Sequence, residues 1–244
     1  MTLTLNGFDF QEQQRKEVNT FSPDLSSFMT RVFGYMGLAV LVSAVTAIMA
    51  GVVFKTAYMS FLATHSWFSF LLIILEFALV FGTSFSVNRG LAKSLLLLFS
   101  FALVNGLMLS TIFMAYTTAN IFSSFIAAAV IFGGMSIYGM ITHRDLSKIG
   151  TQATFALFGV IVVTIINMFL KSSMVTYIFS YIIIAIFIIL TAWDVQRMRQ
   201  IYENYGNQYD INGLAVQGSL QLYLDFINIF LYVLEIFGFS NNRD

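Results

Sequence analysis

The sequence of 244 residues has no cysteine, a single proline and few charged residues. The absence of cysteine excludes disulfides, thiolate metal sites and a cysteine nucleophile. The only proline, Pro23, precedes the long apolar segments, so proline cannot kink them and we expect regular helices. Charged residues make up 10% of the chain, against about 25% in an ordinary soluble domain. Such a chain cannot cover a large soluble core with charge.

Long apolar segments dominate the rest of the sequence, which is 58% hydrophobic with a mean hydropathy of +0.83. Seven segments approach or exceed the roughly 20 residues that a helix needs to cross a bilayer. They are residues 32–54, 67–87, 94–116, 121–142, 151–170, 174–193 and 217–238. We therefore expect an all-α integral membrane protein with seven transmembrane helices. Residues 1–31 are expected to form a polar cytoplasmic tail, 32–238 one membrane domain and 239–244 a short C-terminal tail.

The distribution of lysine and arginine predicts the orientation in the membrane. Nine of the 12 basic residues fall in the N-terminal tail and in the loops on the same side as that tail. Because cytoplasmic loops carry the excess of positive charge, the N-terminus is expected in the cytoplasm. The net charge of +0 and the lack of a basic cluster give no indication of a nucleic-acid partner.

Ionisable residues within apolar segments are rare, because each costs about 3 kcal/mol to insert into the membrane. Here they are Glu76, Asp194 at the inner end of the sixth segment, Asp225 and Glu235. In the seventh segment the polar side chains recur at helical spacing and occupy an arc of about 80° on one face. This polar stripe consists of Gln217, Gln221, Asp225, Asn228, Tyr232 and Glu235. It predicts that the seventh helix is central in the bundle.

Asp194 and Asp225 are expected near the same side of the membrane, because the sixth and seventh segments run in opposite directions. Two carboxylates that meet at low dielectric cannot both ionise cheaply and therefore share a proton. Such a pair would sense pH or bind a cation, and carboxylate oxygens suit calcium. Alternatives remain open: Asp194 could be an exposed residue paired with Arg197, and Asp225 could make only a structural hydrogen bond.

Three further residues are candidates for an accessory role. Asn228 lies one turn from Asp225, and Arg89, at the inner end of the second segment, could pair with Asp194 or simply lie at the interface. Glu76 suits a structural and a functional role equally, whereas Glu235 favours a structural one. An intramembrane enzyme is not expected, because His65 and His143 both fall in loops and no HExxH motif occurs.

Four stretches of sequence are similar to the Bax inhibitor-1 (transmembrane BAX inhibitor motif) family, and to its bacterial branch. They are LTAWDVQR at Leu190–Arg197, GSLQLYLDFINIFL at Gly218–Leu231, ALVNGLMLS at Ala102–Ser110 and GGMSIYGMITHRDL at Gly133–Leu146. The resemblance implies seven helices with the last enclosed by the other six. It also implies that Asp194 and Asp225 are the paired aspartates that the family uses as a proton-sensitive gate for calcium leak. Trp193 stands where members more often have tyrosine.

On this basis we expect a pH-sensitive calcium or cation leak channel of a bacterial inner membrane, with calcium as the permeant ion and no bound cofactor. In that function Asp194 and Asp225 would bind protons or calcium. The alternative is a modulator of membrane-protein quality control that transports nothing and binds a membrane-embedded AAA protease. The resemblance suggests this second function because bacterial relatives are thought to act in that way.

Overall fold

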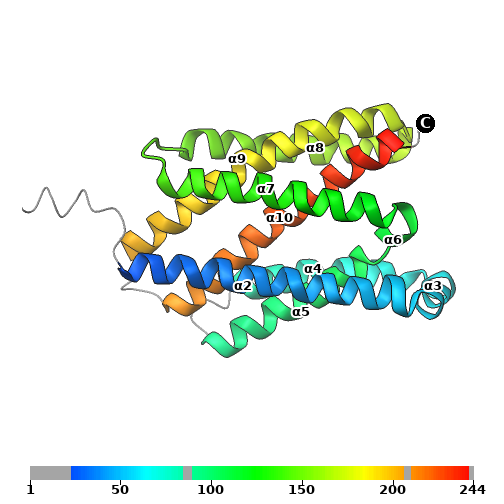
Figure 1. Ribbon diagram of the computed structural model, residues 1–244, viewed down its shortest axis with the longest axis horizontal. Coiled ribbons are helices and arrows are strands. Elements are labelled where there is room, and N and C mark those ends of the chain that lie inside the picture. Colours follow the sequence, from blue (N-terminus) through cyan, green and yellow to red (C-terminus); the bar gives the residue numbers. More distant parts are fainter. Residues whose placement is uncertain (1–22, 85–89, 206–209, 242–244) are drawn as a thin grey trace, which may run out of the picture.

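A computed structural model describes residues 23–84, 90–205 and 210–241 of the chain, and every element in these ranges is helical. The elements are α2 (Pro23–Ile48), the π-helical turn η1 (Met49–Val53), α3 (Lys55–Thr64), α4 (Trp67–Ser84), α5 (Leu91–Leu109), α6 (Ile112–Ala115), α7 (Thr118–Ile141), α8 (Ser147–Leu170), α9 (Ser173–Tyr205) and α10 (Ile211–Asn241). The long helices form one elongated bundle (Figure 1).

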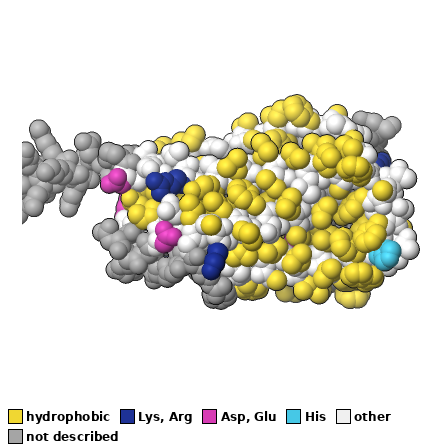
Figure 2. All heavy atoms as spheres, turned by 90° about the horizontal axis from the view of Figure 1, so that it is seen from below, with side chains coloured by type: hydrophobic (Ala, Val, Ile, Leu, Met, Phe, Trp, Pro, Cys, Tyr) yellow, Lys and Arg dark blue, Asp and Glu magenta, His cyan; other side chains and the backbone are white. Residues whose placement is uncertain are grey.

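Six of these helices are long and apolar enough to cross a membrane. A seventh crossing results if α3 and α4, which meet at a bend of 99°, count as one broken span. The apolar surface of the bundle agrees with this, since hydrophobic side chains cover its middle and charged side chains gather near one end (Figure 2). The prediction of an all-helical integral membrane protein is confirmed.

The last helix, α10, runs obliquely through the bundle, with α2 and α5 on one side and α7 and α9 on the other (Figure 1). It packs against α2, α4, α5, α7 and α9. In its most apolar stretch 50% of the residues are buried, against 11% in α8 at the periphery. The central position that the polar stripe predicted for this helix is confirmed.

Several helices extend beyond the predicted spans. α2 begins at Pro23, so residues 23–31, which the sequence assigned to the polar tail, are helical, and Leu25, Phe28 and Met29 are buried. α9 continues to Tyr205 and α10 begins at Ile211, which places polar helical turns outside the apolar region. Hydropathy detects the lipid boundary but not the end of a helix, because backbone hydrogen bonding continues into water.

One irregular turn interrupts the predicted regularity of the first span. η1 is π-helical and contains Gly51, where an added Cβ would lie 2.6 Å from the carbonyl oxygen of Ser110. The close approach of the α5–α6 connection thus coincides with a local widening of the helix, without any proline. The spans were expected to be fairly regular helices without a proline kink, and the first span departs from this regularity only at η1 among its described residues.

Candidate functional site

Asp194 and Asp225 lie against each other in the core of the bundle. Asp194 on α9 is 2% exposed and Asp225 on α10 is 1% exposed, and the two carboxyl groups lie close enough to interact electrostatically. The contact arises because α9 and α10 are consecutive, antiparallel and closely packed. The structure therefore brings together the two residues that the sequence proposed as a pair.

The surroundings of the pair contain one neutral donor. Gln221 Nε2 donates to Asp194 Oδ2 at 3.0 Å, and the Gln221 side chain is exposed while both carboxyl groups are buried. Asp225 Oδ2 is fully buried and receives no hydrogen bond from an amide, hydroxyl or basic group within the described ranges.

Basic residues do not neutralise the pair by direct contact. Within residues 23–84, 90–205 and 210–241 the only ion pair joins Arg199 to Glu203. Arg197 attracts Asp194 electrostatically, but its guanidinium group lies 5.4 Å from the centre of the Trp193 ring and the side chain is exposed. The alternative of an exposed Asp194 paired with Arg197 is therefore wrong. Arg89 lies outside the described residues.

Close packing fixes the position of α9 around Asp194. On α7, Gly139 lies against the backbone of Ala192, and on α8, Gly150 lies against the indole of Trp193. A side chain at either glycine would collide with the residues just before Asp194. The bulky Trp193 is accommodated because its neighbour on α8 is glycine.

Gln196 fastens the same part of α9 to the loop between α7 and α8. Its Oε1 accepts from the backbone amide of Leu146 at 2.9 Å, and its Nε2 donates to the carbonyl oxygen of Arg144 at 2.8 Å. One turn further, Arg199 donates to the carbonyl oxygen of Met140 at 2.9 Å. The polar residues that follow Asp194 therefore position the helix rather than contact the carboxyl pair.

Two of the proposed accessory residues make their hydrogen bonds outside the pair. Asn228 Nδ2 donates to the carbonyl oxygen of Leu224 at 2.7 Å, one turn earlier in its own helix. Glu76, on α4, accepts from Asn105 Nδ2 at 2.8 Å. Asn105 Oδ1 in turn accepts from the hydroxyl group of Tyr223, so Glu76 belongs to a different polar cluster.

The C-terminal part of the polar stripe on α10 contacts polar residues near the start of α9. Ser180 Oγ donates to Glu235 Oε2 at 2.5 Å. Glu235 and Tyr232 line a cavity of about 150 Å³ together with Asn167 and Thr176. Between this cavity and Asp194, the α9 side chains of Ile186, Phe187 and Leu190 are buried. The two polar regions are thus separated by an apolar layer.

Sequence reasoning missed two features of the region. Gln221 was placed on the polar stripe, but not as the donor to Asp194. Ser43 and Tyr223, which connect to Asn105, gave no signal, because each stands within an apolar run and Tyr223 lies off the stripe. Spacing alone does not show which buried hydroxyl groups on separate helices meet.

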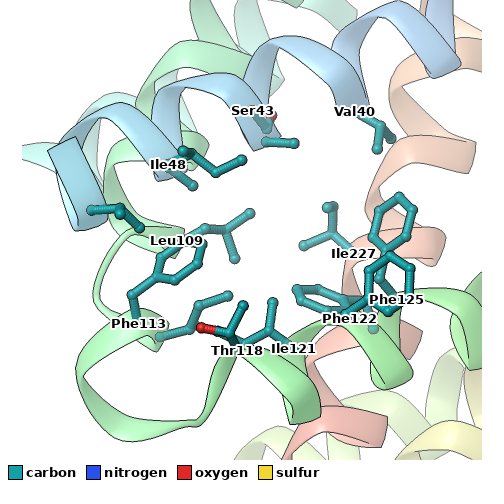
Figure 3. Close-up of a pocket in the computed structure, with 15 residues that line it drawn as sticks. Val40, Ser43, Ile48, Leu109, Phe113, Thr118, Ile121, Phe122, Phe125 and Ile227 are labelled. Atoms are coloured by element: carbon teal, nitrogen blue, oxygen red, sulfur yellow. The ribbon is translucent and has the colours of Figure 1, made fainter.

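A further cavity of about 500 Å³ lies between α2, η1, α6, α7 and α10 (Figure 3). Its lining is apolar apart from Ser43 and Thr118. Aromatic side chains, including Phe113, Phe122 and Phe125, surround it. A cavity of this composition offers no ligands for a cation.

No group of three or more histidine, aspartate or glutamate side chains that could hold a metal ion occurs within the described parts of the chain. Calcium prefers six to eight oxygen ligands. The two aspartates alone do not complete such a set.

The fold and this site define a helical membrane protein with a buried pair of acidic residues beside its central helix. The sequence pattern of the family described as "Inhibitor of apoptosis-promoting Bax1" matches residues 25–242. The chain therefore belongs to the Bax inhibitor-1 family, and the resemblance noted in the sequence is confirmed.

Relatives with similar sequences occur in bacteria. The "Inner membrane protein YbhL" of Escherichia coli is 38% identical over 223 residues, which cover 88% of this chain and 92% of the relative. Uncharacterized proteins of Borreliella burgdorferi and Rickettsia prowazekii are 37% and 35% identical over 228 residues. These matches cover 89% and 92% of this chain, and 94% of each relative.

Proposed function

We propose that this protein is a pH-sensitive cation leak channel of a bacterial inner membrane, gated by Asp194 and Asp225. The observation that carries the proposal is the close approach of two buried carboxyl groups with no ion-pairing partner among the described residues. Two ionised carboxylates that lie close together in the protein interior would repel each other. In the proposed mechanism Asp194 and Asp225 therefore share one proton. The proton keeps α9 and α10 together.

Loss of the shared proton opens the path in this mechanism. The two negative charges repel, α9 separates from α10, and carboxylate oxygens become available to a cation such as calcium. The exposed Gln221 lies between the pair and the surrounding medium, so it is the group that an entering ion meets first. The apolar layer around Ile186 and Phe187 closes the path in the conformation described here.

The orientation follows from the basic residues at the same end as the pair. Arg197 and Arg199 lie within two turns of Asp194, and Arg144 contacts Gln196 through its backbone. Because basic residues are enriched on the cytoplasmic side, this end and the N-terminus are assigned to the cytoplasm. The carboxyl pair then responds to cytoplasmic pH.

Calcium flux into proteoliposomes, measured across pH, tests the proposal. The wild-type leak should increase as the pH rises, because the pair loses its proton. Asp194→Asn and Asp225→Asn should abolish the pH response, since an amide can donate the missing hydrogen at any pH. Asp145→Asn, which changes an exposed loop carboxylate in the same way, is the matched control. Unchanged flux and pH response in both pair variants would refute the gate.

The competing hypothesis, a modulator that binds a membrane-embedded AAA protease, rests on the family resemblance alone. It requires a partner in stoichiometric amounts and no ion path. Cross-linking and copurification from native membranes therefore separate the two functions. A stoichiometric protease complex combined with absent flux in liposomes would favour the modulator.

A further inference from the structure

A second chain of polar side chains crosses the bundle and joins four helices. Asn105 on α5 bonds Glu76 on α4 at 2.8 Å and the hydroxyl group of Tyr223 on α10 at 2.7 Å. The hydroxyl groups of Tyr223 and Ser43 on α2 lie 2.6 Å apart. Tyr223 and Asp225 are two residues apart, which corresponds to about 200° around a helix. The chain therefore runs on the opposite face of α10 from the aspartate pair.

The side chains in this hydrogen-bonded series have few hydrogens to donate. The number of donors therefore fixes the direction in which each hydrogen bond points. The side-chain amide of Asn105 offers a carbonyl acceptor at one end and an NH₂ donor at the other, and each hydroxyl group has one hydrogen. With Glu76 ionised, Asn105 Nδ2 must donate to it. Asn105 Oδ1 then accepts from Tyr223, and Tyr223, having used its hydrogen, must accept from Ser43. This is the pattern in the structure at Asn105.

Once Glu76 is protonated, every one of these bonds can reverse. A neutral carboxyl group donates to Asn105 Oδ1, which requires the amide to turn by about 180° around its terminal bond. The NH₂ group then donates to Tyr223, and Tyr223 donates to Ser43. The hydrogen of Ser43 is released for the carbonyl oxygen of Ala102, which lies 2.8 Å from its Oγ. Each buried group again has a partner.

Backbone packing holds the far end of the chain in place for both directions. Gly106 on α5 packs against the backbone of Ser43. A Cβ added at Gly106 would lie 2.6 Å from the Ser43 carbonyl oxygen. This approach of α2 to α5 keeps the Ser43 hydroxyl group beside Ala102 and Tyr223 at once. The Tyr223 side chain is fully buried, so water does not compete for its bonds.

We propose that Glu76 is a proton-binding site separate from the aspartate pair, and that its protonation reverses the hydrogen-bond chain through Asn105 and Tyr223 to Ser43. The inference requires no ion conduction and does not depend on the proposed function. The ligand of this site is a proton. Protonation of Glu76 on α4 changes the hydrogen bonding between α2 and α5.

Few other charges surround Glu76. It is the only residue of α4 with an acidic or basic side chain, and α5 carries only Lys93, twelve residues from Asn105. Twelve residues correspond to about 18 Å along a helix. From α10, Tyr223 is the titratable group that interacts electrostatically with Glu76. Glu76 itself is half-buried near the middle of α4.

Solid-state NMR of the full chain in bilayers tests the inference when the carboxyl carbons of glutamate and the phenol carbons of tyrosine are labelled with ¹³C. The chain has five glutamates, namely Glu12, Glu17, Glu76, Glu203 and Glu235. Glu76→Gln and Tyr223→Phe assign the two signals of interest. The Glu76 signal should titrate, and the Tyr223 signal should change with the same midpoint.

Four variants distinguish the mechanism from simpler effects. Glu76→Gln should abolish the pH response of Tyr223, whereas Glu235→Gln, which changes the other half-buried glutamate, should preserve it. The double variant Asp194→Asn/Asp225→Asn should also preserve it, because the two sites are separate. Asn105→Leu should leave Glu76 titrating while Tyr223 no longer follows.

Several results would overturn the inference. A Glu76 signal that stays constant over the whole pH range of the folded protein excludes the proton site. A Tyr223 signal that ignores the titration of Glu76 excludes the reversal. A Tyr223 response that persists in Asn105→Leu shows an effect through space, without the amide turn. A response lost in the double aspartate variant assigns it to the aspartate pair.

Discussion

Gly139 of α7 lies directly against the carbonyl group of Ala192 in α9, two residues before Asp194. An added methyl group would meet backbone atoms there, which cannot turn aside as a flexible side chain could. We expect Gly139→Ala to destabilise the protein by about 1–3 kcal/mol, the usual cost of overpacking. Unfolding in mild detergent, followed by circular dichroism, measures the change.

Gly134 on the same helix provides the matched control. An added Cβ at Gly134 meets no atom within 4 Å. Gly134→Ala should therefore be neutral or stabilise α7 by up to about 1 kcal/mol, because alanine favours helix over glycine. Equal effects of the two substitutions would contradict the close contact between α7 and α9.

Gln196 satisfies two backbone groups of the loop between α7 and α8. Gln196→Leu keeps the approximate volume of the side chain and leaves the amide of Leu146 and the carbonyl of Arg144 without these bonds. We expect a loss of about 1–3 kcal/mol for each group that stays unsatisfied. Hydrogen exchange at Leu146 should accelerate in the variant. Unchanged exchange at that amide would show that another acceptor replaces Gln196.

A shared proton between Asp194 and Asp225 makes the stability of the protein depend on pH. Where the folded pair holds one proton that the unfolded chain has released, stability falls as pH rises, by about 1.4 kcal/mol per pH unit. Asp225→Asn removes this dependence, since the amide donates without a proton from solution. Thermal unfolding over a pH series measures both slopes. Parallel slopes for wild type and variant would exclude the shared proton.

Asp145, in the loop before α8, gives a pH response outside the membrane. Hydrogen bonds from the side chain and backbone of Ser147 lower the pKa of Asp145. A lowered pKa means that the stabilising contact is complete above the ordinary aspartate pKa and is lost as pH falls through the lowered value. Ser147→Ala removes the side-chain bond, so the pKa should move back towards its ordinary value, which NMR titration measures.

The sequence predicted the features that depend on the apolar pattern, such as the membrane spans. It did not predict features that depend on hydrogen bonds, such as where each helix ends. The stripe on α10 predicted a central helix because a polar face in an apolar chain must meet other protein. The juxtaposition of Asp194 and Asp225 followed from antiparallel neighbours of similar length. The extension of α9 to Tyr205 gave no such signal, since polar helical turns in water resemble a loop in composition.

The polar partners inside the bundle depended on rotamers and on which helices touch. Asn228 was predicted to assist Asp225 because it lies one turn away, yet its amide bonds its own helix at Leu224. Glu76 was considered for the same site, but α10 separates it from the pair. Depth in the membrane therefore does not show where a polar side chain lies around the central helix.

Beyond the sharp bend that follows α3, the described part of α4 has 18 residues. Its length is about 27 Å, somewhat less than the roughly 30 Å of a typical hydrocarbon core. A bilayer that thins around such a helix brings its headgroups and their hydration shell closer to a residue in the middle of the span, here Glu76. The acyl-chain length of the host lipids then becomes a variable that tunes proton access to this residue, with thicker membranes slowing exchange.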